Sequence, residues 1–222
     1  MPQSLQELEK AITQCDACPR LRKHCQKTAQ EKRKAYLNES YWGRPIPGFG
    51  DPRAKLWVIG LAPAAHGANR TGRVFTGDRS GDWLYRALHK QGFANQPTST
   101  HRDDGLALQG AWISCVARCA PPDNKPLPLE LARCSPHLRR ELELLSQVQV
   151  FIALGQIALH GLWQLLAPGS PRPRFAHGAE VRLPDGRLLL MSYHPSQQNT
   201  FTGRLTEPMF DSVFKRAREL TR

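Results

Sequence analysis

The sequence predicts an α/β fold: a three-layer α/β/α sandwich around a central four-stranded parallel sheet, formed as one domain over residues 1–222. Four short apolar runs lack polar alternation, which is typical of strands covered on both faces. Segments with helical periodicity lie between these runs, so right-handed crossovers can connect parallel strands. The length of 222 residues is sufficient for one hydrophobic core.

The first predicted element is an N-terminal helix in "SLQELEKAIT". Ser4 and Glu7 have the spacing of a capping box, and Leu5, Leu8 and Ile12 recur at helical intervals. The opening "MPQSLQELEK" has no basic head followed by an apolar stretch, so we expect no signal peptide and a cytoplasmic protein. Further on, residues 26–55 are rich in Lys, Arg, Pro and Gly, and "RPIPGFGDPR" is predicted to be an ordered loop with many turns.

The predicted strands are the apolar runs "KLWVIGL" (55–61), "AWISCVA" (111–117), "VQVFIAL" (148–154) and "RLLLMSY" (187–193). The predicted helices are "DWLYRALHKQ", a stretch over residues 129–145, "QIALHGLWQLL" and the C-terminal "TEPMFDSVFKRAREL". Pro136 is expected to break the second of these helices, with Ser135 capping a new one. The Pro-Asp-Gly in "VRLPDGRLLL" indicates a hairpin.

Three unusual loops follow the first, second and fourth predicted strands, at residues 60–79, 118–127 and 194–204. Ligands of open α/β sheets bind where strands end at their carboxyl edge. We therefore expect these loops to meet.

Charge and hydropathy limit the classes of partner. The chain has 31 Lys and Arg against 19 acidic residues, a formal charge of +12, which favours a polyanionic partner, although a merely soluble basic surface is the alternative. The basic residues are spread along the chain, as in a nucleic-acid groove built from several loops. No apolar run approaches the length needed to cross a bilayer, so we expect no membrane association.

Four of the six cysteines have a suggestive spacing. Cys15 and Cys18 form a C-x-x-C pair, and Cys119 and Cys134 follow much later. An even count is compatible with disulfides, but a reducing compartment is favoured without an export signal. An iron–sulfur cluster, a zinc site and unligated core cysteines all remain open on spacing alone.

Two loops carry candidate site residues. "GLAPAAHGANRTGR" (60–73) contains neither G-x-G-x-x-G nor Gly-Lys-Ser, the two glycine patterns of nucleotide-binding loops. It is therefore either a tight packing turn or a loop of small residues whose main chain a flat ligand can approach. His66 within it is then a solvated or capping residue, or a ligand contact. In "SYHPSQQNT", His194 follows a strand directly and is either structural or placed to stabilise charge.

Taken together, "GLAPAAHGANRTGRVFTGDRSGDWL", "CAPPDNKP", "SYHPSQQNT" and the four cysteines closely resemble the uracil-DNA glycosylase superfamily, in its iron–sulfur branch, family 5 or type B. The resemblance implies a DNA repair enzyme that flips a deaminated base out of DNA and hydrolyses its N-glycosidic bond, leaving an abasic site. It also implies a monomer whose partner is DNA, and a structural 4Fe-4S cluster. The ligands would be Cys15, Cys18, Cys119 and Cys134, which tie the N-terminal helix to the loop after the second strand.

The resemblance also implies roles for individual residues. Phe75 resembles the aromatic residue that stacks on the flipped base, and His194 the donor to its carbonyl oxygen. Many relatives orient water with a polar residue in the first motif, where this chain has Leu61 and Ala64, so Asp78 is the expected substitute. Asn124 matches a polar residue of the same site.

The remaining contacts follow from the same motifs. Expected contacts to the base come from Gly60, Leu61, Ala62, Pro63, Ala64, His66, Gly67, Phe75 and Cys115, and expected contacts to DNA from Asn69, Arg70, Arg73, Ser196, Gln197, Gln198 and Asn199. Cys115 stands where uracil-specific relatives carry an asparagine, and a thiol is a poor bidentate partner. The pocket is therefore expected to accept several deaminated bases, hypoxanthine and xanthine among them.

Three other functions are compatible with parts of the sequence. An iron–sulfur DNA-binding module without chemistry would keep the charge and the cysteines. A radical enzyme would use the cluster chemically, but its usual C-x-x-x-C-x-x-C is absent. A glycosylase-lyase would need a lysine near a motif, for which Lys125 is the candidate.

Overall fold

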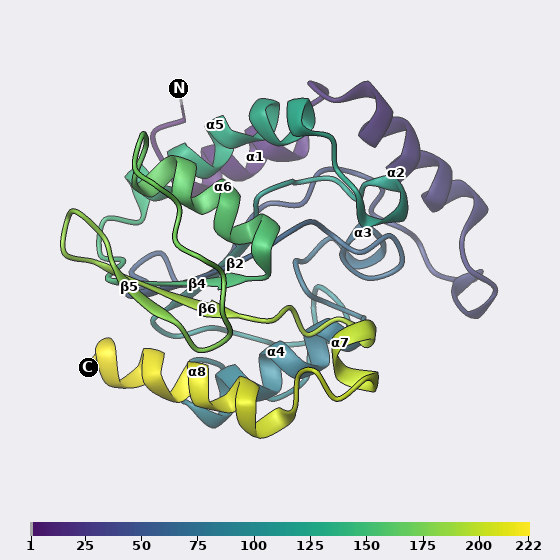
Figure 1. The fold of residues 1–222 in the computed structure, drawn as a ribbon. Helices are drawn as coiled ribbons and strands as arrows, with labels where there is room; N and C mark the ends of the chain where they lie inside the picture. Colours follow the sequence, from purple (N-terminus) through teal and green to yellow (C-terminus); the bar gives the residue numbers. More distant parts are fainter. Residues whose placement is uncertain (1) are drawn as a thin grey trace.

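A mixed sheet forms the middle layer of residues 2–222, the part of the chain that the computed structural model describes. Within these residues the sheet has six strands, in the order β1-β3-β2-β4-β6-β5 (Figure 1). The strands are β1 (Phe49–Gly50), β2 (Leu56–Gly60), β3 (Ala111–Cys115), β4 (Val150–Leu154), β5 (Glu180–Arg182) and β6 (Leu188–Ser192). Met1, with which the predicted domain 1–222 begins, lies outside the described residues.

Helices cover both faces of this sheet (Figure 1). One face carries α1 (Leu5–Thr13), α5 (Pro128–Leu144) and α6 (Gln156–Leu166), and the other carries α4 (Arg79–Lys90) and α8 (Glu207–Leu220). Beside the edge where the parallel strands end lie α2 (Pro19–Glu31), α3 (Ala68–Thr71) and α7 (Gln197–Phe201). Two short 3-10 helices are η1 (Lys34–Tyr36) and η2 (Pro122–Asn124). No helix within residues 2–222 combines the length and apolarity needed to cross a membrane.

Alternate residues of each inner strand face opposite helical layers, which explains the missing polar alternation. Val58 is in register with Ile113 on one side and Ile152 on the other, and all three belong to the core beneath α4 and α8. Their neighbours Trp57 and Phe151 are also paired and belong to the core beneath α1, α5 and α6. Every residue of β2, β3 and β4 is therefore buried.

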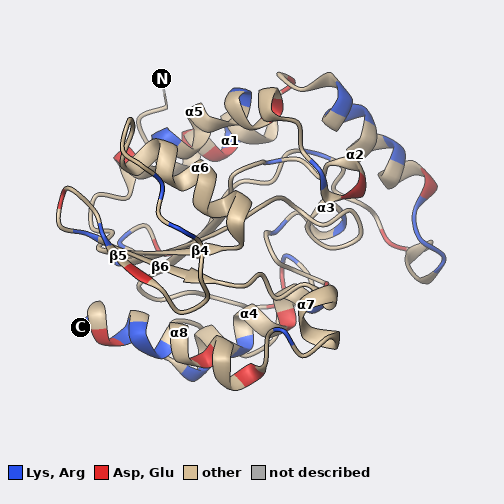
Figure 2. Cartoon of the chain, in the orientation of Figure 1, with Lys and Arg blue, Asp and Glu red and all other residues tan. Residues whose placement is uncertain are grey.

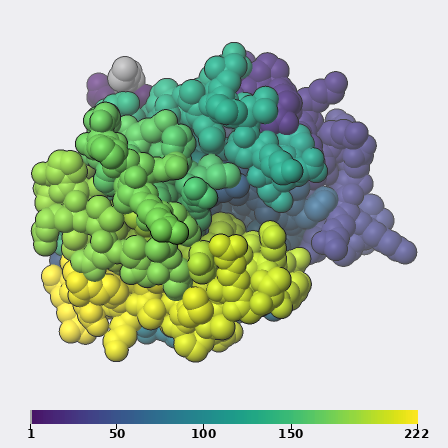
Figure 3. All heavy atoms as spheres, in the orientation of Figure 1, coloured from purple at the N-terminus to yellow at the C-terminus, as the bar shows by residue number. Residues whose placement is uncertain are grey.

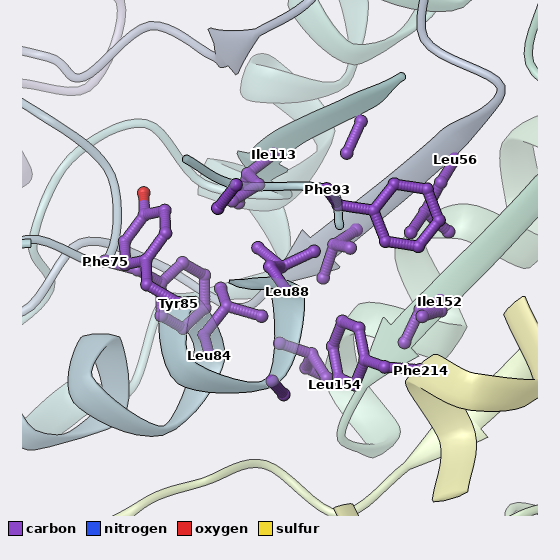
Figure 4. Close-up of a cluster of buried hydrophobic side chains, with 14 of the residues drawn as sticks. Leu56, Phe75, Leu84, Tyr85, Leu88, Phe93, Ile113, Ile152, Leu154 and Phe214 are labelled. Carbon is purple, nitrogen blue, oxygen red and sulfur yellow. The ribbon is translucent and has the colours of Figure 1, made fainter. Parts of the chain in front are cut away.

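The larger core lies between the sheet and the helices α4 and α8. Figure 4 shows Leu84 and Leu88 of α4 and Phe214 of α8 directed toward the strand residues Ile113 and Ile152. All five side chains are completely buried. This packing fixes α4 against the sheet, and thereby the loop that precedes α4.

The sheet corrects the prediction of four parallel strands. The predicted strands correspond to β2, β3, β4 and β6, which do pair in parallel. The sheet is extended by β1 and β5, which pair antiparallel with β3 and β6 at its two edges. The β5–β6 pair is the hairpin predicted from Pro-Asp-Gly. The other edge strand escaped prediction because it has only two residues.

The helix broken at Pro136 is the second correction, because α5 runs through this residue without interruption. Proline has no N–H to donate to the carbonyl four residues earlier, which is that of Ala132. The hydroxyl of Ser135 donates to this carbonyl instead, at 2.9 Å. Ser135 therefore repairs the hydrogen bond that Pro136 removes, rather than capping a new helix.

The sequence analysis predicted no helix at the start of the segment 26–55, where α2 extends to Glu31. Pro19 occupies the first turn of α2, and Leu21, Cys25 and Thr28 form its buried face. These three residues have helical spacing, but only one is strongly apolar. The helical periodicity of this segment is therefore not evident from its apolar residues, and basic residues dominate its composition.

A fully buried ion pair joins the end of β3 to α5. Arg118 is 2% and Glu141 1% exposed. Arg118 Nη1 lies 3.1 Å from Glu141 Oε1, and Nη2 donates to the other carboxylate oxygen. The indole of Trp112 also donates to Glu141 Oε1, at 3.4 Å. This pair fixes the loop after β3, which carries Cys119.

Removing one partner of this pair is expected to cost far more than removing both. Arg118→Met leaves the Glu141 carboxylate buried and unpaired, and we expect a loss of about 3–5 kcal/mol in the free energy of unfolding. The double variant Arg118→Met/Glu141→Leu should recover most of this loss, because no uncompensated charge remains. Urea unfolding of both variants measures the difference. Equal destabilisation of the single and double variants would contradict the assignment.

Candidate active site at the carboxyl edge of the sheet

The three loops that follow β2, β3 and β6 meet around one cavity of about 610 Å³, as the sequence predicted. The first loop contributes two stretches to its wall, and the other two loops contribute one each. The lining residues are Leu61, Ala62, Pro63, Ala64, Phe75, Asp78, Arg79, Ser80, Asp123, Asn124, His194, Ser196, Gln197 and Gln198. All three predicted catalytic residues, Asp78, Asn124 and His194, are thus brought together.

A second cavity of about 610 Å³ lies between α5 and α6, away from these loops. Its wall is largely apolar and includes Leu131, Leu138 and Leu165, together with His160 and two arginines. It contains no carboxylate. The cavity at the sheet edge is the better candidate because it combines an imidazole, a carboxylate and an aromatic ring.

Phe75 has a backbone conformation that non-glycine residues rarely adopt, with φ of 51°. Its ring lies directly over Gly60, where a Cβ would come within 2.6 Å of the ring atom Cζ. Its ring also stacks against the imidazole of His194, with centroids 5.8 Å apart and an interplanar angle of 30°. Strained backbone at a cavity wall is typical of functional sites.

Buried hydrogen bonds on both sides hold Phe75 in this conformation. The hydroxyl of Tyr85 donates to the carbonyl of Val74 at 2.8 Å. On the other side, Arg73 donates through Nε to Thr76 Oγ1 at 3.0 Å and through Nη2 to Asp104 Oδ2 at 2.7 Å. Arg73 is only 4% exposed. The predicted contact of Arg73 with DNA phosphate is therefore corrected: its charge is neutralised inside the protein.

Asp78 forms the N-cap of α4. Its Oδ1 accepts a hydrogen bond from the N–H of Gly81 at 3.0 Å. The other carboxylate oxygen occupies the space that a side chain at position 67 would need, so Gly67 is required there. Burial raises the pKa of Asp78, while hydrogen bonds from the N–H groups of Gly81 and Ser80 act in the opposite direction. One oxygen is thus held by the helix, and the residue lines the cavity.

His194 is neutral at physiological pH. Burial lowers the pKa of its imidazole to about 4. Its backbone is fixed by Asn199, whose side-chain Nδ2 donates to the carbonyl of His194 at 2.9 Å. A neutral imidazole can donate one hydrogen bond to an anion or a carbonyl oxygen without carrying a full charge. Asn199, predicted to contact DNA, thus also positions the backbone of His194.

Asp123 and Asn124 contribute the second loop. Both have left-handed backbone conformations, with φ of 54° and 56°. Asp and Asn tolerate this region better than other residues with side chains. The turn brings both residues to the cavity wall.

Asn69 and Arg70 are interior residues, which corrects their predicted contact with DNA. Asn69 is completely buried, and its amide donates to the carbonyl of Cys25 at 3.3 Å. Arg70 is 7% exposed and forms an ion pair with Glu39. Its Nε donates to the carbonyl of His66 at 2.8 Å and its Nη2 to the carbonyl of Gly77 at 2.9 Å. Arg70 therefore ties together two parts of the loop after β2.

Within residues 2–222, four predicted base contacts lie outside the cavity lining: Gly60, His66, Gly67 and Cys115. Gly60 and Gly67 leave room for Phe75 and Asp78. Cys115 is 3% exposed and lies behind Gly60. His66 faces Tyr41 instead, with Nδ1 and the phenolic oxygen 3.0 Å apart.

The loop after β6 forms α7. The hydroxyl of Ser196 caps this helix by accepting from the N–H of Asn199 at 3.4 Å, and Gln197 and Gln198 are exposed at the cavity. Sequence reasoning missed Phe201, which is 66% exposed and lies 4.6 Å from the guanidinium of Arg79. It also missed Arg79 itself, Ser80 and Asp123. Arg79 and Ser80 follow Asp78 in the sequence, and Asp123 precedes Asn124. This proximity to predicted site residues could have identified them.

The four predicted ligand cysteines converge on one small cavity. Cys15, Cys18, Cys119 and Cys134 line a space of about 20 Å³, together with Arg22, Arg118, Glu130, Arg133 and His137. Within residues 2–222, no group of three or more His, Cys, Asp or Glu side chains is arranged to hold a single metal ion. Four thiols of this kind are the donor set of an iron–sulfur cluster.

Burial and the neighbouring Arg118 have opposite effects on the pKa of the Cys134 thiol, and burial has the larger effect. Burial raises the pKa of Cys134 to about 11, while the Arg118 guanidinium and its backbone N–H act in the opposite direction. That N–H donates to Cys134 Sγ at 3.3 Å. Cys25 is completely buried beside this site in contact with Cys119 and is a further thiol outside the predicted set.

The imidazole of His194 is expected to remain largely neutral down to about pH 5, because burial lowers its pKa to about 4. Its side-chain nitrogen signals in ¹⁵N NMR should therefore stay constant from pH 8 to about pH 5. Titration of His194 with a midpoint near about 6.5, the ordinary value for a histidine side chain, would contradict this prediction.

Comparison with known proteins tests the resemblance seen in the sequence motifs. The model of the uracil DNA glycosylase superfamily matches residues 47–218. The type-5 uracil-DNA glycosylase of Mycobacterium tuberculosis is 50% identical over 98% of this chain and 82% of its own length. The type-5 enzyme of Thermus thermophilus is 49% identical over 94% of both chains. That of Pyrobaculum aerophilum is 43% identical over 93% of this chain and 88% of its own.

The matched segment begins before β1 and ends within α8, so it contains all three loops of the cavity. The cysteines Cys15 and Cys18 precede it, but the type-5 relatives cover nearly the whole chain. The motif resemblance is thereby confirmed: this chain belongs to the uracil-DNA glycosylase superfamily, and its near-full-length relatives are type-5 members.

Proposed function

We propose that this protein is a monofunctional DNA glycosylase that flips a deaminated base out of DNA and hydrolyses its N-glycosidic bond, leaving an abasic site. The observation that carries the proposal is the single cavity in which Phe75, Asp78 and His194 meet. A base must leave the helical stack to reach such a cavity. The names of the type-5 relatives support uracil as one substrate.

Each wall of the cavity has a role in this reaction. The ring of Phe75 offers a flat apolar face to the extruded base, and the small residues Ala62, Pro63 and Ala64 let the base edge approach the main chain. His194 donates a hydrogen bond to the carbonyl oxygen of the base as negative charge develops there. Because this imidazole is neutral and fixed, the donor needs no rearrangement during the reaction.

Bond breaking and water addition follow from these positions. The bond between C1′ and the base nitrogen breaks, and its electron pair leaves with the base. A water molecule adds its oxygen to C1′, and its proton passes to Asp78 or to solvent. Leu61 and Ala64 have no polar side-chain atom for this purpose, which supports Asp78 as the residue that orients the water. Asn124 assists from the opposite loop.

Two features support hydrolysis without strand cleavage by a lysine. Lys125 is exposed and does not line the cavity. No other lysine belongs to the lining within residues 2–222. The cavity lining therefore offers no lysine amine that could form a Schiff base with C1′.

We also propose that hypoxanthine and xanthine are substrates. Cys115 lies behind Gly60 and offers no bidentate partner to a pyrimidine edge. The volume of about 610 Å³ leaves room for a purine. Base recognition would then rest on stacking and main-chain contacts, which are similar for several bases.

The four cysteines are proposed to hold a 4Fe-4S cluster. Cys15 and Cys18 lie between α1 and α2, whereas Cys119 follows β3 and Cys134 lies in α5. When bound, the cluster supplies a structural cross-link between these segments. The residues themselves position the loop after β3, which contains Asn124.

Replacing the proposed catalytic side chains should abolish excision while leaving the fold intact. Asp78→Asn and His194→Gln are each expected to lower the rate of uracil excision by about 10²–10³-fold. Asp82→Asn is the matched control, because Asp82 is exposed one turn further along α4 and outside the cavity. The assay uses duplexes that carry uracil, hypoxanthine or xanthine, followed by alkaline cleavage of abasic sites.

The outcomes separate the proposals. An iron–sulfur DNA-binding module would bind all duplexes and produce no abasic sites. Removal of uracil alone would refute the broad specificity, and wild-type rates in Asp78→Asn would refute the role of Asp78.

Metal analysis of anaerobically purified protein tests the cluster. We expect about four iron atoms per chain with broad visible absorbance. Cys134→Ser should lose the iron and unfold at lower temperature, because a link between α5 and the N-terminal segment is removed. Cys115→Ser, outside the set, should keep it. Stoichiometric zinc, or iron retained in Cys134→Ser, would contradict the assignment.

A further inference from the structure

Half of the net charge of the protein is concentrated in one short segment. Residues 19–34, here called the basic arm, include seven Lys and Arg and one acidic residue, a formal charge of +6 out of +12 for the chain. The arm consists of α2 and the turn that leads into η1. Figure 2 shows its basic residues following one another along α2, and Figure 3 shows the segment projecting at the edge of the molecule.

Most of this charge is available to a partner. Lys23, Lys27, Arg33 and Lys34 are exposed. The acidic residue, Glu31, forms only an exposed pair with Lys27 at 3.6 Å, and such pairs are weak. The apolar face of α2 is already covered by the protein core. The arm thus presents charge, not an apolar groove.

Hydrogen bonds attach the arm to the candidate active site. The hydroxyl of Tyr41 accepts from the N–H of Arg33 at 3.3 Å and also bonds His66, in the loop after β2. Asn69, in the same loop, donates from its side-chain amide to the carbonyl of Cys25 in α2 at 3.3 Å. Its neighbour Arg70 donates to the carbonyls of His66 and Gly77. Gly77 directly precedes Asp78. The arm and the cavity wall are therefore held in one fixed relation.

The site itself has few cations for a phosphate backbone. Arg70 and Arg73, which the sequence suggested for this purpose, are buried and paired. Among the residues that line the cavity, Arg79 alone carries a positive charge, and its guanidinium lies against Phe201. DNA that enters the cavity must find most of its counter-charge elsewhere on the surface.

We infer that the basic arm is a second DNA-binding surface, which holds the phosphate backbone of the duplex flanking the flipped nucleotide. This inference rests on the proposed function. It states in which direction the flanking duplex extends from the cavity, namely toward α2. Gln197 and Gln198 of α7 line the cavity, and α7, α3 and α2 follow one another beside the same edge of the sheet (Figure 1). A duplex that reaches both α7 and the basic arm contacts Gln197 and Gln198 near the lesion and Lys23, Lys27 and Lys34 further along.

The experiment compares two variants from which equal charge has been removed. The arm variant is Lys23→Gln/Lys27→Gln/Lys34→Gln. The control variant is Lys10→Gln/Arg182→Gln/Lys215→Gln, three exposed cations on α1, β5 and α8. Fluorescence anisotropy measures binding of each to an undamaged labelled duplex of about 25 base pairs, or roughly two and a half helical turns, over a range of salt concentrations. Circular dichroism confirms that both variants are folded.

For the arm variant we expect about 10-fold weaker binding and a salt slope that is smaller by about 0.9 for each phosphate that the arm no longer neutralises. The control variant should bind like the unmodified protein. Equal weakening in both variants would overturn the inference, because it would show that only net charge matters. Unchanged binding in the arm variant would also overturn it.

A second substrate separates this inference from the proposed function. A uracil-containing single strand of about five nucleotides has no flanking duplex for the arm to hold. The arm variant should excise uracil from it at the rate of the unmodified protein, while KM for the uracil-containing duplex rises. An equal loss on both substrates would contradict the assignment. Absence of excision by every form would instead refute the proposed function and leave the binding comparison valid.

Discussion

Parallel pairing of β2, β3, β4 and β6 is the constraint on which the candidate site depends. Because these strands run in one direction, their carboxyl ends lie at one edge, and the loops that follow three of them must share the space beyond it. No loop contains a complete site. Phe75 and Asp78 come from the first, Asn124 from the second and His194 from the third, so the fold assembles the chemistry.

The loops around the cavity are held in place by buried guanidinium groups. Arg70, Arg73 and Arg118 are all less than 8% exposed, and each forms an ion pair with a carboxylate. Arg73 holds the backbone around Phe75, Arg70 connects the two halves of the same loop, and Arg118 holds the loop after β3. Long, planar donors suit this purpose because one side chain can satisfy several carbonyl and carboxylate oxygens. The positive charges of these buried arginines are paired within the protein and cannot bind DNA phosphates. In our proposal, the exposed cations of the basic arm bind those phosphates instead.

The elements that could be predicted from the sequence are those determined by local patterns. The buried strands, the hairpin before β6 and the convergence of the three loops follow from apolar runs and turn residues near one another in the chain. The burial of Arg70 and Arg73 could not be predicted in this way, because Glu39 and Asp104 each lie 31 residues from their partners. The continuity of α5 depends on one hydroxyl, that of Ser135, which a propensity rule does not consider. The motif resemblance identified Asp78, Asn124 and His194, and the structure brings all three to the cavity at which their loops meet.

A crystal structure of Asp78→Asn bound to a duplex with one 2′-fluoro-2′-deoxyuridine tests the central claim most directly. The fluorine disfavours positive charge on the sugar, so the glycosidic bond should survive crystallisation. The account predicts that the uracil lies against Phe75 with a carbonyl oxygen within hydrogen-bond distance of His194, and that the flanking phosphates follow the basic arm. A uracil that remains stacked in the duplex, or that occupies the cavity between α5 and α6, would contradict it.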